Sequence, residues 1–182
     1  GAETSLPYAQ FDSARRRVKE APGINFAGRI GLEPGCVVLQ ADTVSPGSRL
    51  PYPEIGYDYT VSFTVEGRTE EPGTELFRSD DAVFYLSDPI SGMMGFARDG
   101  YLNTFRYSIQ NGDRLDVVIK GDSRSTTLII NGRVIDRLET EKRWHNEGES
   151  VMYYVPTLVF PLQQAGDFRS RITNLKVYNH YN

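Results

Sequence analysis

The sequence predicts an all-β domain, a two-sheet antiparallel jelly-roll sandwich. Three observations predict it. Apolar and polar residues alternate strictly over residues 57–65, Asn131-Gly132 forms a hairpin signal, and turn residues separate short apolar runs about every 8–12 residues. No helix-period segment of useful length follows residue 23, which argues against parallel βαβ architecture. The 182 residues fit one domain, and a hydrophobic content of 39% supports a core.

Residues 1–23 differ from the remainder of the chain. The segment 8–20 is polar, contains the basic cluster 15–19 and stops at Ala21-Pro22-Gly23. We interpret residues 1–23 as a linker or docking arm and residues 24–182 as the sandwich domain.

Nucleic-acid binders normally carry a basic patch. One small basic cluster in a chain with a net charge of -4 therefore predicts no nucleic-acid partner.

The clearest strand lies at residues 57–65. Tyr57, Tyr59, Val61, Phe63 and Val65 alternate with polar residues, and successive side chains of a strand point to opposite faces. This pattern predicts a strand with one buried face.

Further strands are predicted where short apolar runs alternate with turns. They cover residues 75–78, 83–86, 93–97, 102–109, 115–119, 127–130, 134–135, 157–160 and 172–178. Asn131-Gly132 predicts a type I′ turn between two of these strands. We expect the core to contain Val61, Phe63, Leu76, Phe84, Phe96, Phe105, Val117, Ile119, Leu128, Ile130, Leu175 and Val177.

Two stretches interrupt this rhythm. Residues 42–56 contain three prolines, and residues 139–156 contain the only tryptophan and one of the two histidines. Both are predicted to be long loops, and long loops in compact domains often carry function.

Cysteine, histidine and hydropathy restrict the chemistry further. Cys36 is the only cysteine, so no intrachain disulfide forms, and its place before an apolar run is typical of a small buried residue. His145 and His180 are too isolated to indicate a transition-metal site. No apolar stretch is long enough to cross a bilayer, so we predict no membrane insertion.

Several motifs together resemble a laminin-G-like domain. The runs 76–79 (LFRS), 84–86 (FYL), 95–100 (GFARDG), 116–119 (DVVI) and 126–133 (TTLIINGR) resemble its middle strands. The ending 172–179 (ITNLKVYN) is similar to its closing strand. The family belongs to the concanavalin-A-like lectin and glucanase superfamily. The ending also resembles modules carried behind bacterial glycoside hydrolases, β-N-acetylhexosaminidases in particular.

The resemblance implies a non-catalytic accessory module of a glycoside hydrolase that binds carbohydrate weakly. The alternative is a structural module that packs on and stabilises the catalytic domain upstream in the same chain. The position of the last strand near the end of the sequence favours a C-terminal module. We expect a monomer located in the periplasm or outside the cell.

Catalytic members of the superfamily require two carboxylates on one strand face, about 5–5.5 Å apart in retaining enzymes. No run here matches their Glu-x-Asp motif, and the acidic pairs fall in turns or in the irregular stretch. We therefore predict that the isolated domain is not an enzyme. These acidic pairs are Glu70-Glu71, Asp80-Asp81, Glu139/Glu141 and Glu147/Glu149.

The resemblance also implies a sugar site of aromatic and polar residues. Trp144 offers the largest stacking surface and is flanked by the polar residues Arg143 and His145. Tyr52 and Tyr101 would complete a platform, and Arg143 would bond to hydroxyl groups or to an anionic sugar. The alternative for Trp144 is packing of the core or of a loop.

A structural calcium ion is common in laminin-G-like domains. The candidate ligands are Asp42, Asp80, Asp81 and Asp122, all in predicted turns. The alternative is that these turns favour aspartate because its side chain bonds to nearby backbone.

Overall fold

The computed structural model describes residues 37–50, 56, 58–98, 100–139, 141–144, 151–154, 158 and 160–179. Of Val38 and of residues 141–144 and 151–154 it describes the backbone alone. The predicted arm 1–23, Cys36, Tyr57 and His180 lie outside the described residues.

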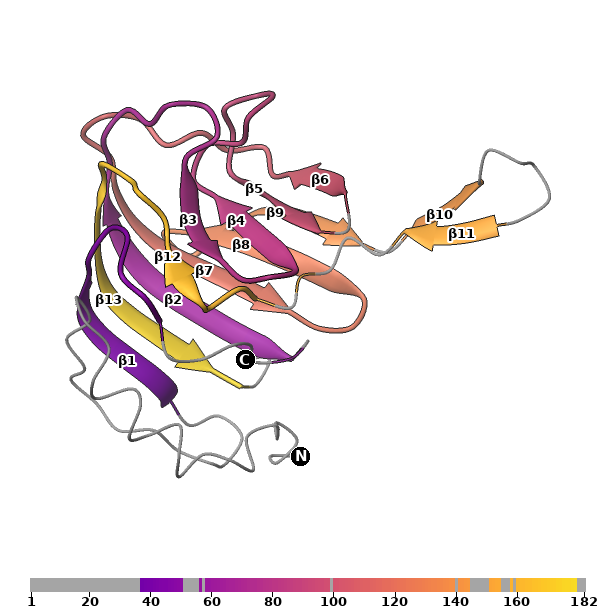
Figure 1. The fold of residues 1–182 in the computed structure, drawn as a ribbon, viewed down its shortest axis with the longest axis horizontal. Coiled ribbons are helices and arrows are strands. Elements are labelled where there is room, and N and C mark those ends of the chain that lie inside the picture. The colour runs from indigo at the N-terminus through magenta and orange to yellow at the C-terminus, as the bar shows by residue number, and fades with distance from the viewer. Residues whose placement is uncertain are drawn as a thin grey trace.

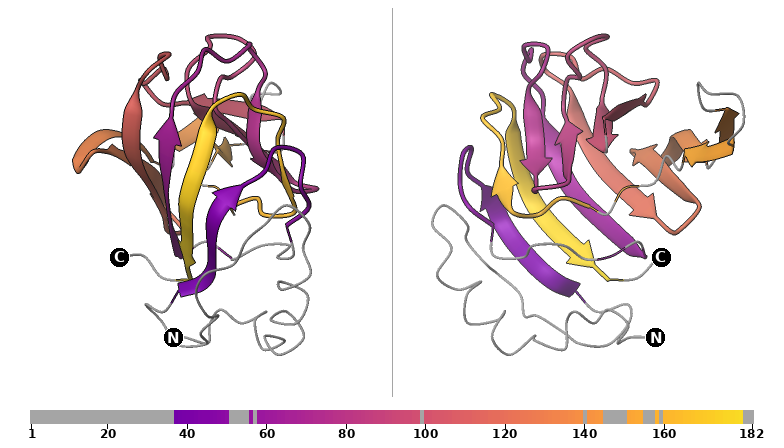
Figure 2. Two further views of the ribbon diagram at one scale, coloured as in Figure 1. Left: turned by 90° about the vertical axis from the view of Figure 1, so that its left-hand side faces the viewer. Right: turned by 45° about the vertical axis from the view of Figure 1, so that its right-hand side comes forward.

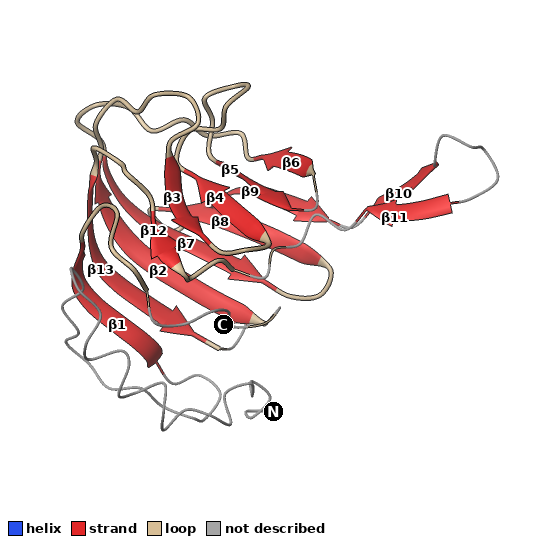
Figure 3. Ribbon diagram, viewed as in Figure 1, coloured by secondary structure: helices blue, strands red, loops and turns tan. Residues whose placement is uncertain are grey.

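Two antiparallel sheets pack into a sandwich, as predicted (Figure 1). The described residues contain no helix (Figure 3). In order across the six-stranded sheet lie β1 (Val37–Val44), β13 (Arg171–Tyr178), β2 (Tyr59–Glu66), β7 (Arg114–Gly121), β8 (Ser125–Ile130) and β9 (Arg133–Glu139). The five-stranded sheet holds β12 (Gln164–Ala165), β3 (Glu75–Arg78), β4 (Ala82–Tyr85), β5 (Gly95–Arg98) and β6 (Tyr101–Thr104).

The prediction that residues 139–156 form a long loop is wrong in part. β10 (Glu141–Trp144) and β11 (Val151–Tyr154) pair antiparallel as a two-stranded ribbon, with Trp144 opposite Val151. The ribbon stands beside the sandwich rather than within either sheet (Figure 2). Aromatic and β-branched residues such as those of β11 favour strands, and the charged residues around them obscured that pattern.

The core follows from the alternation along the strands. On β2, Tyr59, Val61, Phe63 and Val65 are buried, and all twelve residues predicted for the core are 5% exposed or less. Phe160 lies among three core rings, with centroids 5.6 Å from Tyr59 and between 5.7 and 5.8 Å from two others, Phe77 and Phe84. Phe160 joins the core from irregular backbone, because the strand predicted at 157–160 does not form at residues 158 and 160. The strand predicted at 102–109 ends at Thr104.

The Asn131-Gly132 turn is confirmed. Both residues have positive φ, 51° and 80°, as a type I′ turn requires. The Asn131 side chain adds a bond, because its Oδ1 accepts the backbone N–H of Asp116 at 2.7 Å. The Asn131 N–H returns a bond to the Asp116 carbonyl at 2.8 Å.

Replacing Asn131 with alanine should lower the free energy of unfolding by about 1–2 kcal/mol, since alanine strains at positive φ and lacks the side-chain bond. Replacement with glycine removes only the bond, because glycine tolerates positive φ. Urea unfolding of the three proteins measures both effects. Equal losses in the alanine and glycine variants would show that φ strain contributes nothing here.

The edge strands β6 and β9 belong to different sheets and are connected at one side of the sandwich. Asp136 of β9 accepts a bond from the backbone N–H of Arg106, just after β6, at 3.1 Å. The Arg106 guanidinium Nε lies 3.4 Å from the same carboxylate.

No helix in the described part of the chain is long and apolar enough to span a membrane.

Candidate functional site

The outer face of the five-stranded sheet carries a row of polar and aromatic residues. The strand register places Glu75 of β3 opposite Tyr85 of β4, Tyr85 opposite Gly95 of β5, and Gly95 opposite Thr104 of β6. Gly95 is buried at its place in this row. Only glycine fits there, because a Cβ would meet the Asn103 carbonyl oxygen at 2.5 Å.

A β-bulge brings Glu75 and Arg78 to this same face. Residues three apart in a regular strand point to opposite faces. The register shift between Glu75 and Phe77 adds a residue, so Glu75 pairs with Tyr85 while Arg78 pairs with Val83. Leu76 and Phe77 both point away from solvent and are fully buried.

Glu75 and Arg78 form a bidentate ion pair. The Arg78 Nε donates to Oε1 of Glu75 at 2.7 Å, and its Nη2 donates to Oε2 at 2.8 Å. The hydrogen bond from Arg78 to Glu75 raises the pKa of the guanidinium above its usual value. This planar pair is fixed in direction, as bidentate pairs are.

Tyr85 lies half-buried beside this ion pair. Burial raises the pKa of its hydroxyl, and the negative charges of Glu75 and Asp88 raise it further, while Arg78 acts in the opposite direction. The ring therefore lies within the electrostatic field of these three groups.

A cleft of about 300 Å³ adjoins the row at Glu75. Its lining also includes Asp167, which is distant in sequence but close in space. Gly166 permits this approach: its N–H donates to the Leu76 carbonyl at 2.8 Å, and a Cβ would lie 1.9 Å from the Glu75 carbonyl oxygen. The remaining lining residues are Pro72, Gly73 and Thr74.

Asp88 supports the far end of the row from a buried position. Its carboxylate accepts the N–H groups of Ile90 and Ser91 at 2.7 and 2.6 Å and the Thr104 hydroxyl at 3.0 Å, together with the Ser91 hydroxyl. Burial raises the pKa of Asp88, but these donors outweigh burial and the net pKa is lowered. The network fixes the β4–β5 loop, which holds Ile90 in solvent with 84% exposure.

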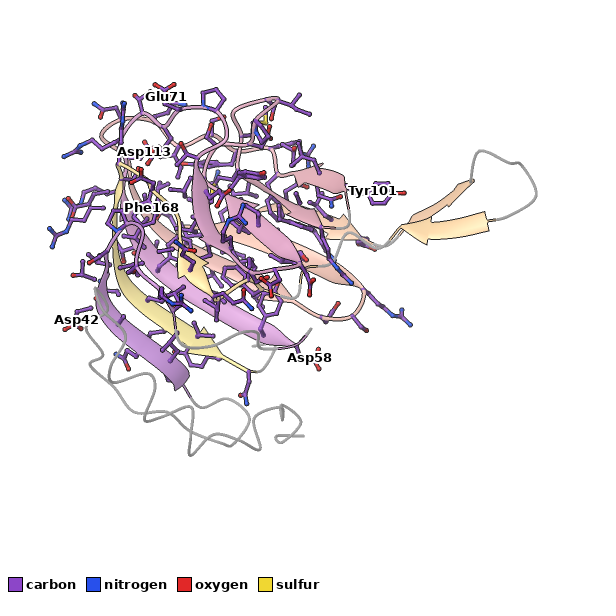
Figure 4. All side chains as sticks on the ribbon, in the orientation of Figure 1. Asp42, Asp58, Glu71, Tyr101, Asp113 and Phe168 are labelled. Carbon is purple, nitrogen blue, oxygen red and sulfur yellow. The ribbon has the colours of Figure 1, made fainter. Side chains whose placement is uncertain are left out.

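The residues predicted for the sugar site lie elsewhere. Tyr101 is 38% exposed on edge strand β6, on the side from which the ribbon extends (Figure 4). Tyr101 is three residues from Thr104, so it lies on the opposite face of β6 from the Tyr85 row. Trp144 and Arg143 belong to β10, whose side chains are not described, and Tyr52 and His145 lie outside the described residues. Their role stays a prediction.

The four predicted calcium ligands are not brought together. The prediction of a turn is wrong for Asp42, which is exposed on β1 because this strand continues to Val44. Asp80 and Asp81 lie between β3 and β4, and Asp122 follows β7. Among the described residues, no three acidic, histidine or cysteine side chains gather to hold a metal ion. Calcium binding stays a prediction, and the four aspartates do not form one site for it.

Asp122 and Glu70 have backbone partners. Asp122 Oδ1 accepts the N–H groups of Arg124 and Ser125 at 2.7 and 2.8 Å. This bonding to nearby backbone is the role given above as the alternative to calcium binding. The Glu70 carboxylate accepts the N–H groups of Arg169 and Ser170, which ties two loops together.

Comparisons with known proteins concern the fold. No protein-family model matches the chain, and no curated protein matches its sequence. Domain 4 of AbnA, a GH43 extracellular arabinanase from Geobacillus stearothermophilus solved with arabinotriose, matches at a TM-score of 0.52 and 17% identity. The match covers 87% of this chain and 81% of that domain, and it shows that the two share the β-sandwich fold.

Two further solved structures match less well. A Trypanosoma rangeli sialidase matches at a TM-score of 0.43 and 14% identity over 79% of this chain, which spans 25% of the sialidase chain. A mutant of the alginate lyase Aly36B, solved with alginate tetrasaccharide, matches at 0.33 and 16% identity, over 93% of this chain and 91% of the lyase.

Proposed function

We propose that this domain is a laminin-G-like, non-catalytic accessory module of a glycoside hydrolase, and that it binds carbohydrate weakly at the Tyr85 site. The Tyr85 site comprises Tyr85, the Glu75–Arg78 ion pair and the adjoining cleft with Asp167. The observation that carries the proposal is the position of an aromatic ring beside a fixed ion pair, on a solvent-facing sheet and next to a cleft.

The chemistry of the site suits a sugar ring. A pyranose or furanose presents an apolar C–H face and a rim of hydroxyl groups. The Tyr85 ring offers an apolar surface for the C–H face. Glu75 accepts hydrogen bonds and Arg78 donates them, and their mutual bond fixes both for the hydroxyl rim. Such an open site predicts affinities in the micromolar to millimolar range, about -8 to -4 kcal/mol.

The accessory role rests on resemblance and on compatibility of the fold. The C-terminal motif resembles modules of bacterial β-N-acetylhexosaminidases. The arabinanase domain that shares this fold is one domain of an extracellular enzyme and is complexed with arabinotriose, so the fold is compatible with a sugar ligand. The proposed partners are therefore a glycan and the catalytic domain of the same chain, in the periplasm or outside the cell. The isolated domain should release no product from β-glucans or hexosaminides.

Replacing Tyr85 with alanine should weaken glycan binding about ten-fold, because the stacking surface is lost. Isothermal titration against arabinan, β-glucan and N-acetylhexosamine oligosaccharides measures the change. Tyr101→Ala is the matched control, since Tyr101 is an exposed tyrosine on the opposite face of the same sheet. The melting temperature of each variant reports whether it folds.

Two outcomes contradict the placement of the site. If Tyr101→Ala or Trp144→Ala abolishes binding while Tyr85→Ala retains it, the sugar binds near the β6 edge or the ribbon. If the folded wild-type domain binds none of the glycans, the alternative role as a structural module that stabilises its catalytic partner is the better account.

A further inference from the structure

The lining of the cleft is negatively charged. Glu75 and Asp167 contribute two carboxylates, and the other lining residues, Pro72, Gly73 and Thr74, are uncharged. Arg78 compensates for Glu75 alone, because its guanidinium bonds to both Glu75 oxygens. Of the two lining carboxylates, one therefore keeps a negative charge that Arg78 does not compensate.

That charge belongs to Asp167. Its side chain is exposed, and no ion pair or hydrogen bond joins it to another described residue. Two residues after Asp167, Arg169 forms a loose ion pair with Glu71, with 3.9 Å between Nη2 of Arg169 and Oε2 of Glu71. Glu71 and Phe168 lie at the same end of the sandwich (Figure 4). Asp167 is thus available to an incoming cation.

The field at the aromatic ring has the same sign. Burial is the main cause of the raised pKa of the Tyr85 hydroxyl; the charges of Glu75 and Asp88 raise this pKa further, and Arg78 opposes them. A cation next to an aromatic ring is attracted by the ring face as well. The cleft and the ring therefore favour the same ligand charge.

We infer that the glycan recognised at the Tyr85 site carries free amino groups, with an ammonium group bound by Asp167 and the sugar ring on Tyr85. This inference rests on the proposed carbohydrate binding. The ligand class is an amino sugar polymer that is not N-acetylated. Glycans that carry carboxylate or sulfate groups are repelled by the uncompensated charge.

Three oligosaccharides of equal length test the charge: a glucosamine oligomer, its fully N-acetylated counterpart and an oligogalacturonate. The first two differ at C2 of each sugar, where the glucosamine oligomer carries an ammonium group and its counterpart an uncharged acetamido group. At low salt we expect the glucosamine oligomer to bind about five-fold more tightly than the N-acetylated one, the size of a favourable exposed ion pair. Added salt should reduce this preference, because it screens exposed charges.

Asp167→Asn should remove the preference, so that the glucosamine oligomer binds no more tightly than the N-acetylated one. Asp42→Asn, which changes an exposed aspartate on edge strand β1 of the other sheet, should preserve it. Tyr85→Ala should weaken both oligomers.

The inference is overturned if the N-acetylated oligomer or the oligogalacturonate binds at least as tightly as the glucosamine oligomer, or if the preference survives in Asp167→Asn. In each case binding sensitive to Tyr85→Ala would leave the proposed carbohydrate binding intact. Absence of binding by all three would overturn both.

Discussion

Replacing Phe160 with alanine is expected to lower the free energy of unfolding by about 3–5 kcal/mol. Phe160 is fully buried, and its ring contacts Tyr59 of the six-stranded sheet and Phe77 and Phe84 of the five-stranded sheet. Alanine would leave a cavity between the sheets that neither can fill without moving the other. The ring also adds tilted and edge contacts beyond its buried area.

Chemical denaturation of the wild type and the variant measures this loss. Phe160→Leu retains most of the volume and should lose less. Ile90→Ala is the control, because its side chain is exposed and its removal should change stability by less than about 0.5 kcal/mol. A loss below about 1 kcal/mol in Phe160→Ala would mean that this residue does not occupy the centre of the core.

Replacing Asp88 with alanine should cost about 3 kcal/mol, because two backbone N–H groups and two hydroxyl groups lose a charged acceptor at a buried position. The β4–β5 loop should also lose its fixed conformation, and hydrogen exchange at Ile90 and Ser91 should accelerate. Unchanged exchange at both amides would rule out Asp88 as the group that holds the loop. Asp88→Asn tests the charge separately, since it preserves the shape.

The contribution of Asp88 should depend on pH in a definite direction. The pKa of Asp88 is lowered in the folded protein, so its carboxylate stabilises the fold above the ordinary aspartate value of about 3.9. This stabilisation is lost as pH falls below that value and through the lower pKa of the folded state. The stability difference between wild type and Asp88→Asn should therefore be full at pH 7 and shrink on acidification. A difference that stays constant down to acid unfolding would contradict the assigned pKa direction.

The core was predictable from the sequence and the Tyr85 site was not. Alternation with a period of two follows from strand geometry, so Val61, Phe63, Val117 and Ile119 were assigned to the inner face correctly. The positive φ at Asn131 likewise follows from the turn chemistry of Asn-Gly. Both signals are local in the chain.

The residues of the site depend on irregularities and long-range contacts. Period-two reasoning separates Glu75 from Arg78, and only the bulge at residues 75–77 unites them. Asp167 reaches Glu75 through the close approach at Gly166, which no local pattern indicates. Asp88 was missed because it follows a strand like any turn aspartate. The one local signal was that two adjacent apolar residues, Leu76 and Phe77, separate Glu75 from Arg78. This signal indicates a shared face only if the bulge is already known.

The place of β13 in the six-stranded sheet constrains how the chain folds. β13 lies between β1 and β2, so residues 171–178 separate strands that precede them by more than a hundred positions. During synthesis β1 cannot join the sheet until residue 178 has left the ribosome, and until then β1 and one edge of β2 expose unpaired backbone groups. Contacts between residues so distant in sequence slow folding. We therefore expect a nascent chain of this domain to be exposed to edge-to-edge aggregation until its last strand is complete.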